Sequence, residues 1–81
     1  MTKMQLLQGL DRVDRPDAYD IADSLRVSYP AAAMALLRLV RQGLAARYLD
    51  PESDVYWYEL TPKGEARLDY LDPPVLEEAD A

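Results

Sequence analysis

The chain has 81 residues, and its nine basic and fifteen acidic residues give a formal net charge of −6. This length suits one small domain, and the absence of cysteine and histidine excludes disulfides, nucleophile–histidine pairs and the usual zinc sites. No apolar run is long enough to span a membrane, and the start of the chain is too charged for a signal peptide. We therefore expect a soluble, cytoplasmic protein without cofactor, metal or catalytic activity.

Three helices are predicted in the first half of the chain, over residues 1–13, 18–26 and 29–42. The first has an apolar row at helical spacing, formed by Met4, Leu7, Leu10 and Val13. The second has a similar face, formed by Ala18, Ile21, Ala22 and Leu25. Each helix start carries a residue suited to cap the first turn, namely Thr2, Asp17 and Ser28. The short connection between the second and third helices is typical of a helix-turn-helix.

A change of period after the third helix predicts a β-hairpin. Gly43 is expected to end the helix in a left-handed conformation. The segments AARYLD and DVYWYEL then flank the turn-forming tripeptide PES, which predicts two paired strands. Because alternate side chains face opposite sides of a strand, we expect Tyr56, Tyr58 and Leu60 to face the helices and Trp57 to face outward.

A final helix and a tail are predicted after the hairpin. Thr61 and the proline that follows it favour a helix start, and the spacing of Leu68 and Leu71 gives this helix a buried edge. Residues 73–81 are rich in proline and acidic residues, so we expect a flexible tail there. The folded domain is accordingly predicted to span residues 1–72.

The basic residues are distributed unevenly along the chain. Residues 26–49 contain no acidic residue and four arginines, Arg26, Arg38, Arg41 and Arg47. The rest of the chain has five basic and fifteen acidic residues, a balance of −10. This segregation favours a directed basic patch, although arginines on a helix also serve simply to solvate its surface.

Three motifs follow one another between residues 17 and 68. They are DAYDIADSL, LLRLVRQGLAAR and YELTPKGEARL. In this order and spacing they resemble the winged helix-turn-helix family, in particular its MarR-like and PadR-like regulators, over most of residues 17–72. The resemblance implies a mainly α fold with a small β-hairpin, in which the third helix contacts DNA and the hairpin is the wing. Gly64 in the last motif is expected to allow the final helix a close approach.

The third helix is predicted to have a core face and an outer face. The core face comprises Tyr29, Ala32, Ala33, Leu36, Leu39 and Val40, with Leu37 at its margin. The outer face comprises Pro30, Ala31, Met34, Ala35, Arg38, Arg41 and Gln42. Its N-terminal half, which in such helices usually contacts base edges, offers no amide or guanidinium. Arg38 is therefore the candidate for a base contact, and Arg41 and Arg47 are placed for phosphate.

Two functional hypotheses remain open from the sequence. The first is a DNA-binding transcriptional regulator of modest affinity for double-stranded DNA, with contacts from Arg26, Ser28, Ala31, Met34, Ala35, Arg38, Arg41 and Arg47. The acidic hairpin tip DPESD would repel phosphate, so we expect it to stay away from DNA. The second is a protein interaction module that uses Met34, Trp57 and the tyrosines. The resemblance implies a symmetric pair on DNA. We expect any homodimer to form through the first helix or the outer hairpin face, and we expect no small-molecule ligand.

Overall fold

The structure, a computed structural model, describes residues 1–71. Its elements are α1 (Lys3–Arg12), α2 (Ala18–Leu25), α3 (Tyr29–Arg41), β1 (Ala45–Asp50), β2 (Val55–Leu60) and α4 (Pro62–Leu71). This is the predicted order of three helices, a hairpin and a fourth helix. The predicted tail and the boundary at residue 72 lie outside the described residues.

Side-chain caps determine where the first three helices begin. The Thr2 hydroxyl accepts a hydrogen bond from the backbone N–H of Gln5 at 3.1 Å, and the Gln5 side chain accepts from the Thr2 N–H at 2.9 Å. Asp17 and Asp20 form the same reciprocal pair at the start of α2, at 2.8 and 3.0 Å. At α3 the Ser28 hydroxyl oxygen accepts from the Ala31 N–H at 3.2 Å. All three predicted caps are confirmed, and they leave fewer unpaired N–H groups at these ends.

The core lies where α1, α2 and α3 meet under the hairpin. Its buried residues are Leu6, Leu7, Leu10, Ala18, Ile21, Ala22, Ala32, Leu36, Leu39, Leu44, Ala45, Tyr58 and Leu68. The face predicted for α1 is partly wrong, because Leu6 is buried while Met4 and Val13 are only half-buried. The prediction that Tyr29 is a core residue is also wrong. Its side chain is 44% exposed, and its ring centroid lies 4.3 Å from that of Tyr19 on α2.

The hairpin is joined to the helical part by the segment between α1 and α2. β1 and β2 pair antiparallel, with Ala45 opposite Leu60 and Asp50 opposite Val55. Tyr58, buried as predicted, donates its backbone N–H to the carbonyl of Pro16 at 2.8 Å. This contact holds β2 against the connection that precedes α2. Tyr56, predicted to face the helices, is 42% exposed because it lies further toward the hairpin tip.

The end of α3 and the start of α4 are held together closely. Gly43 has φ +76°, the left-handed conformation expected of it. The Thr61 hydroxyl donates to the Gly43 carbonyl at 2.6 Å and accepts from the Gly64 N–H at 3.0 Å. A Cβ on Gly64 would collide with the carbonyl oxygen of Leu44, which confirms the predicted close approach of this helix. Leu71, predicted to be buried, is 38% exposed among the described residues.

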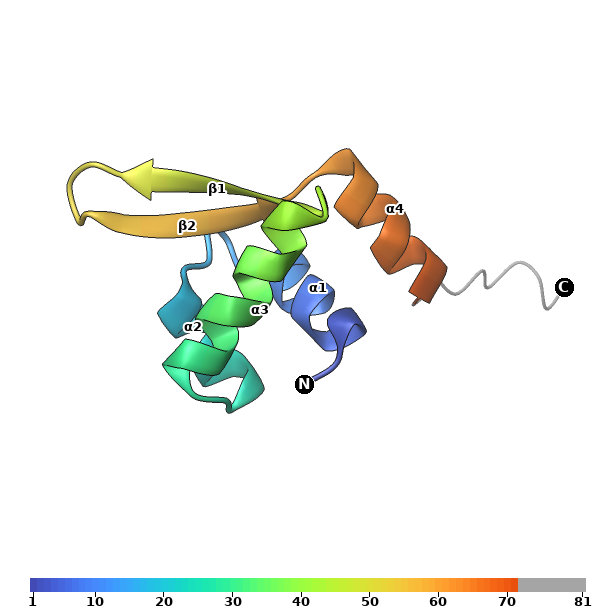
Figure 1. The fold of residues 1–81 in the computed structure, drawn as a ribbon, viewed down its shortest axis with the longest axis horizontal. Helices are drawn as coiled ribbons and strands as arrows, with labels where there is room; N and C mark the ends of the chain where they lie inside the picture. Colours follow the sequence, from blue (N-terminus) through green and yellow to red (C-terminus); the bar gives the residue numbers. More distant parts are fainter. Residues whose placement is uncertain (72–81) are drawn as a thin grey trace, which may run out of the picture.

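The arrangement leaves one long side of α3 uncovered. In Figure 1 the hairpin projects to one side of the molecule and α4 lies at the other, while α3 runs down the centre with α1 and α2 beside it. The buried residues of α3 face α1 and α2, and the opposite side of the helix is exposed.

Candidate nucleic-acid interface

The exposed side of α3 carries small, apolar and basic side chains. Ala31, Arg38 and Arg41 are exposed, and Met34 is 53% exposed, so no described element covers these residues. The predicted outer face is confirmed at these positions. The exposed side of α3 thus carries two guanidinium groups toward its C-terminal end and mainly small or apolar side chains in its N-terminal half.

The turn between α2 and α3 presents two further candidates. Arg26 is exposed and caps α2 in a left-handed conformation, with φ 56°. Ser28 is also exposed, and its oxygen accepts the capping bond from the Ala31 N–H. Its hydroxyl hydrogen is not needed for that bond, so Ser28 can cap α3 and still donate to an external acceptor.

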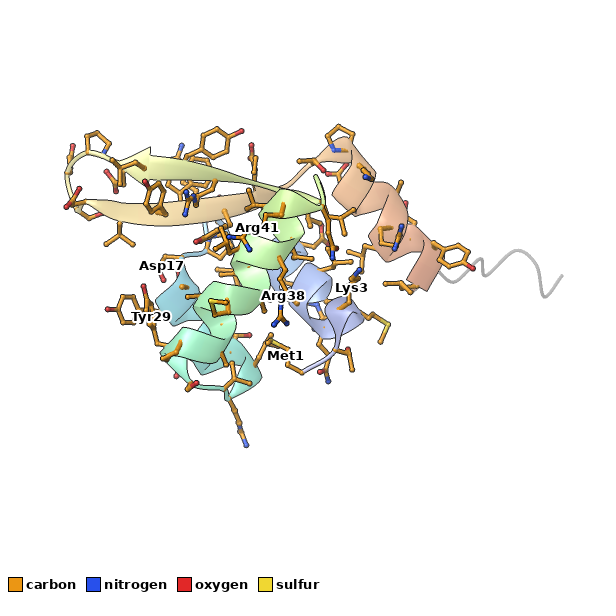
Figure 2. The ribbon with its side chains drawn as sticks, in the orientation of Figure 1. Met1, Lys3, Asp17, Tyr29, Arg38 and Arg41 are labelled. Atoms are coloured by element: carbon orange, nitrogen blue, oxygen red, sulfur yellow. The ribbon has the colours of Figure 1, made fainter. Side chains whose placement is uncertain are left out.

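Ala35 lies at the edge of the exposed side, not within it. It is half-buried and packs against the core, and with Lys3, Leu6 and Arg38 it lines a shallow groove between α3 and the start of α1. The prediction that Ala35 belongs to the outer face is therefore wrong. Figure 2 shows Arg38 on the front of α3 with Lys3 on the neighbouring α1. The groove places these two cations along one border of the exposed side.

Arg47 lies on the other border of α3, on β1. Its guanidinium stacks over the ring of Tyr56 at 4.2 Å, which keeps an exposed cation in one place. Tyr19, Tyr29 and Tyr56 line one hollow between α2, α3 and the hairpin. This grouping of tyrosines was not predicted from the sequence. For the contact between Arg47 and Tyr56, the available sequence signal was their diagonal position across the predicted hairpin.

Comparisons with known proteins identify the fold. No protein-family model matches the sequence, and no curated protein matches it. Among solved structures, a MarR family transcription regulator, SP03579, matches with 26% identity and a TM-score of 0.79, over 96% of this chain and 48% of that one. The transcriptional repressor CouR, bound to a 23-mer DNA duplex, matches with 28% identity and a TM-score of 0.76, over 83% of this chain and 48% of that one. A point mutant of S. aureus MepR, bound to an oligodeoxyribonucleotide, matches with 23% identity and a TM-score of 0.76, over 96% of this chain and 67% of that one.

The chain has the winged helix-turn-helix fold of the MarR family. The predicted fold class and family resemblance are therefore confirmed. In winged-helix terms α2 and α3 form the helix-turn-helix, α3 is the recognition helix and the β1–β2 hairpin is the wing. The chain spans about half the length of the SP03579 and CouR chains it matches.

The tip of the wing is acidic and largely exposed. Asp50 ends β1 and its carboxylate accepts from the Glu52 N–H at 3.0 Å, and Asp54 lies directly before the return strand. The nearest basic residue of the strands is Arg47, three residues before Asp50. The tip of this winged helix is thus a region of negative charge beside the neutral and basic surface of α3.

The outer face of the wing is more covered than predicted. Trp57 is half-buried: Tyr48 stacks on it with ring centroids 4.7 Å apart, and the Arg15 guanidinium lies 5.3 Å from its ring. The backbones of Asp17 and Trp57 also form a β-bridge. Tyr48 hydrogen-bonds to Glu59, and this bond, the charge of Glu59 and slight burial raise the pKa of Tyr48. The cover comes from the α1–α2 connection, so Trp57 offers less free surface than an outward tryptophan would.

Two kinds of site are not found in the described part of this winged helix. Within residues 1–71 no helix is long and apolar enough to cross a membrane. The same residues contain no grouping of three or more acidic side chains placed to hold a metal ion.

Proposed function

We propose that this chain is a winged-helix DNA-binding protein that regulates transcription. The observation that carries the proposal is the uncovered side of α3, with Arg38 and Arg41 exposed, on a fold that CouR shows bound to a DNA duplex. An enzymatic role has no support among the described residues, and SP03579 and CouR are both regulators by name.

On the exposed side of α3, small and apolar side chains allow close approach to DNA, and arginines supply the charged contacts. Ala31 and Met34 let the helix lie deep in the major groove and contact thymine methyl groups. Arg38 reaches base edges, while Arg41 and Arg47 contact phosphates. The remaining proposed contacts come from the turn before α3 and from the edge of its exposed side, namely Arg26, Ser28 and Ala35. Ala35 takes part only at the edge, because it is half-buried.

Binding of this kind is mainly electrostatic and of modest affinity. Each phosphate contact made by a cation adds about 0.9 to the magnitude of the slope of log K against log salt concentration, so three or four contacts give a slope of about −3. The contacts made by alanine and methionine add little discrimination between bases, because neither side chain carries a hydrogen-bonding group able to distinguish them.

Fluorescence anisotropy with labelled random and genomic duplexes at low salt tests the proposal. The variant R38A/R41A/R47A should lose most of its affinity while its circular dichroism spectrum and melting temperature stay close to those of the parent. Arg12→Ala is the matched control, because Arg12 is exposed at the end of α1, away from α3. A triple variant that binds as well as the parent would overturn the proposal.

A second candidate function is protein recognition through Met34. Its side chain is 53% exposed in the middle of a helix face, which is a favourable position for an apolar anchor. Met34→Ala removes this anchor without adding charge and should weaken such a complex strongly, whereas a DNA complex made mainly by arginines should weaken only modestly. Comparing the two effects in one set of binding assays decides between the candidates.

We further propose that two copies bind one DNA site, as the symmetric pairing of helix-turn-helix proteins implies. Sedimentation velocity with and without a duplex of two helical turns tests this. A species with two protein copies per duplex is expected. One copy per duplex at saturating protein would rule out paired binding.

A further inference from the structure

A second group of cations lies outside the exposed side of α3. A pocket of about 310 Å³ is formed where α1 begins, α3 ends and α4 begins, and it is lined by Lys3, Gln42, Leu44, Lys63 and Arg67. We call it the α1/α4 basic pocket. Three of the nine basic residues of the chain line it, and among residues 1–71 no acidic residue does. In a chain with a net charge of −6 such a concentration is not expected from composition alone.

The pocket is built by elements far apart in the sequence. Lys3 is the first residue of α1, and Lys63 and Arg67 lie one turn apart on α4. The Lys63 ammonium donates to the carbonyl of Gln42 at 3.0 Å, so it also caps the end of α3. Lys3 and Arg67 are exposed. Their charges are therefore available to an anion without disturbing this cap.

The acidic residue between Lys63 and Arg67 in the sequence lies elsewhere. Glu65 on α4 lines a different hollow, which also includes Asp11, Asp14 and Glu59. α4 thus presents its basic residues toward the end of α3 and Glu65 toward the hairpin side. This separation keeps the pocket positive although α4 as a whole carries both charges.

The pocket is continuous with the border of the recognition helix. The shallow groove that contains Ala35 and Arg38 shares Lys3 and Gln42 with it. The basic surface therefore runs from Arg38 across the start of α1 to Arg67. It lies on the side of α3 opposite the hollow that Tyr29 and Tyr56 share with the wing.

We propose that the α1/α4 basic pocket binds backbone phosphates of the DNA strand that flanks α3 on the side away from the wing. This inference rests on the proposed function. The major groove is about 12 Å wide and a helix with its side chains about 10–12 Å across, so both phosphate walls lie close to the flanks of α3. The flank on the wing side carries Arg47 and, further out, the acidic wing tip, whereas the other flank carries Lys3, Lys63 and Arg67. Phosphate contacts are therefore more favourable on the second flank, which carries three cations, than on the wing side, where Arg47 lies beside an acidic tip.

The salt dependence of DNA binding tests the inference. K3Q/R67Q should reduce the slope of log K against log salt by about 1.8, because two charged phosphate contacts are lost. K3R/R67K keeps both charges and should keep the parent slope. R12Q/R15Q removes the same net charge outside the pocket and is expected to leave the slope unchanged. Lys63 is left intact in all variants because it caps α3, and melting temperatures confirm that each variant is folded.

The outcomes separate the two proposals. A parent that does not bind DNA overturns both. A parent that binds DNA and loses binding in R38A/R41A/R47A, but has the same slope in K3Q/R67Q, overturns the pocket alone. A titration with inorganic phosphate at constant ionic strength, monitored by the NMR chemical shifts of the Lys3 and Arg67 amides, shows whether the pocket binds a free anion. Binding of free phosphate without a change in the DNA slope likewise overturns the inference.

Discussion

At the scale of single residues, Gly64 determines how closely α4 can approach the end of α3. The backbone N–H of Thr61 bonds to the Leu44 carbonyl at 3.1 Å, and the same oxygen occupies the place that a Cβ on Gly64 would need. The atom in the way is backbone and cannot rotate aside as a side chain could. A substituent at Gly64 therefore has to displace the helix that carries half of the α1/α4 basic pocket.

We expect Gly64→Ala to lower the free energy of unfolding by about 1–3 kcal/mol, the usual range for overpacking. Thermal unfolding followed by circular dichroism measures this. Gly9→Ala is the matched control: its Cβ would meet only the end of the Ile21 side chain at 3.2 Å, and alanine favours the helix by about 0.5–1 kcal/mol. Equal melting temperatures for the two variants would contradict the assignment of the Leu44 contact.

Tyr48 gives a prediction about pH. Its hydrogen bond to Glu59, together with the charge of that carboxylate, raises the pKa of Tyr48 above its ordinary value of about 10. The fold thus favours the neutral phenol, so this contribution to stability is complete below pH about 10 and is lost as the pH rises through the folded-state pKa. Glu59→Gln should return the pKa of Tyr48 toward its ordinary value, measured by carbon NMR of the ring. An unchanged pKa would show that Glu59 is not the cause.

At the scale of elements, the features of α3 that depend on adjacent residues were predicted correctly, whereas two that depend on contacts with other elements were not. Ser28 and Gly43 are recognisable from neighbouring residues alone, because a cap and a left-handed terminator involve only the adjacent turn. Tyr29 and Ala35 were misassigned because a helical projection treats the helix as evenly covered. Tyr29 lies in the first turn, where it stacks on Tyr19. Ala35 packs against the core and lines a groove together with the start of α1, which is distant in sequence.

The exposed side of α3 and its edge should respond differently to the same substitution. Ala31→Gln is expected to weaken DNA binding strongly while stability changes by no more than about 0.5 kcal/mol, because Ala31 is exposed. Ala35→Gln should cost about 1–3 kcal/mol, since the side chain has to enter the groove against α1. Urea unfolding and anisotropy on both variants measure the two effects. Met34→Asp serves as a check, because a loss of several kcal/mol there would place Met34 in the core and refute the assigned faces.

At the scale of the whole molecule, basic charge is concentrated on one surface of an acidic protein. The sequence analysis recovered the part contributed by residues 26–49, since those arginines are close in the chain. Lys3, Lys63 and Arg67 could not be grouped from the sequence, because only the packing of α1 and α4 against the end of α3 brings them together. The net charge of the chain therefore gives a poor account of its basic surface, which depends on where a few cations are placed by the fold.

This arrangement predicts unusual binding kinetics. Over long distances DNA meets a protein of net charge −6 and is repelled, while at contact it meets arginines and lysines. Raising salt from about 0.01 to 0.15 M shortens the screening length from about 30 to 8 Å and so weakens the repulsion first. We expect the association rate to stay level or rise with salt and the dissociation rate to carry the loss of affinity. Stopped-flow measurements test this, and an association rate that falls steeply with salt would contradict it.

Trp57 is the chain's single tryptophan, and its position makes it a native spectroscopic reporter. Its ring is enclosed between Tyr48 and Arg15, so its emission depends on whether the α1–α2 connection is seated on the hairpin. It lies on the face of β2 opposite Tyr58, away from the recognition helix. Its fluorescence should therefore follow unfolding without any label and remain nearly constant when DNA occupies α3. A change in emission on adding DNA would reveal that the hairpin shifts against the α1–α2 connection as the complex forms.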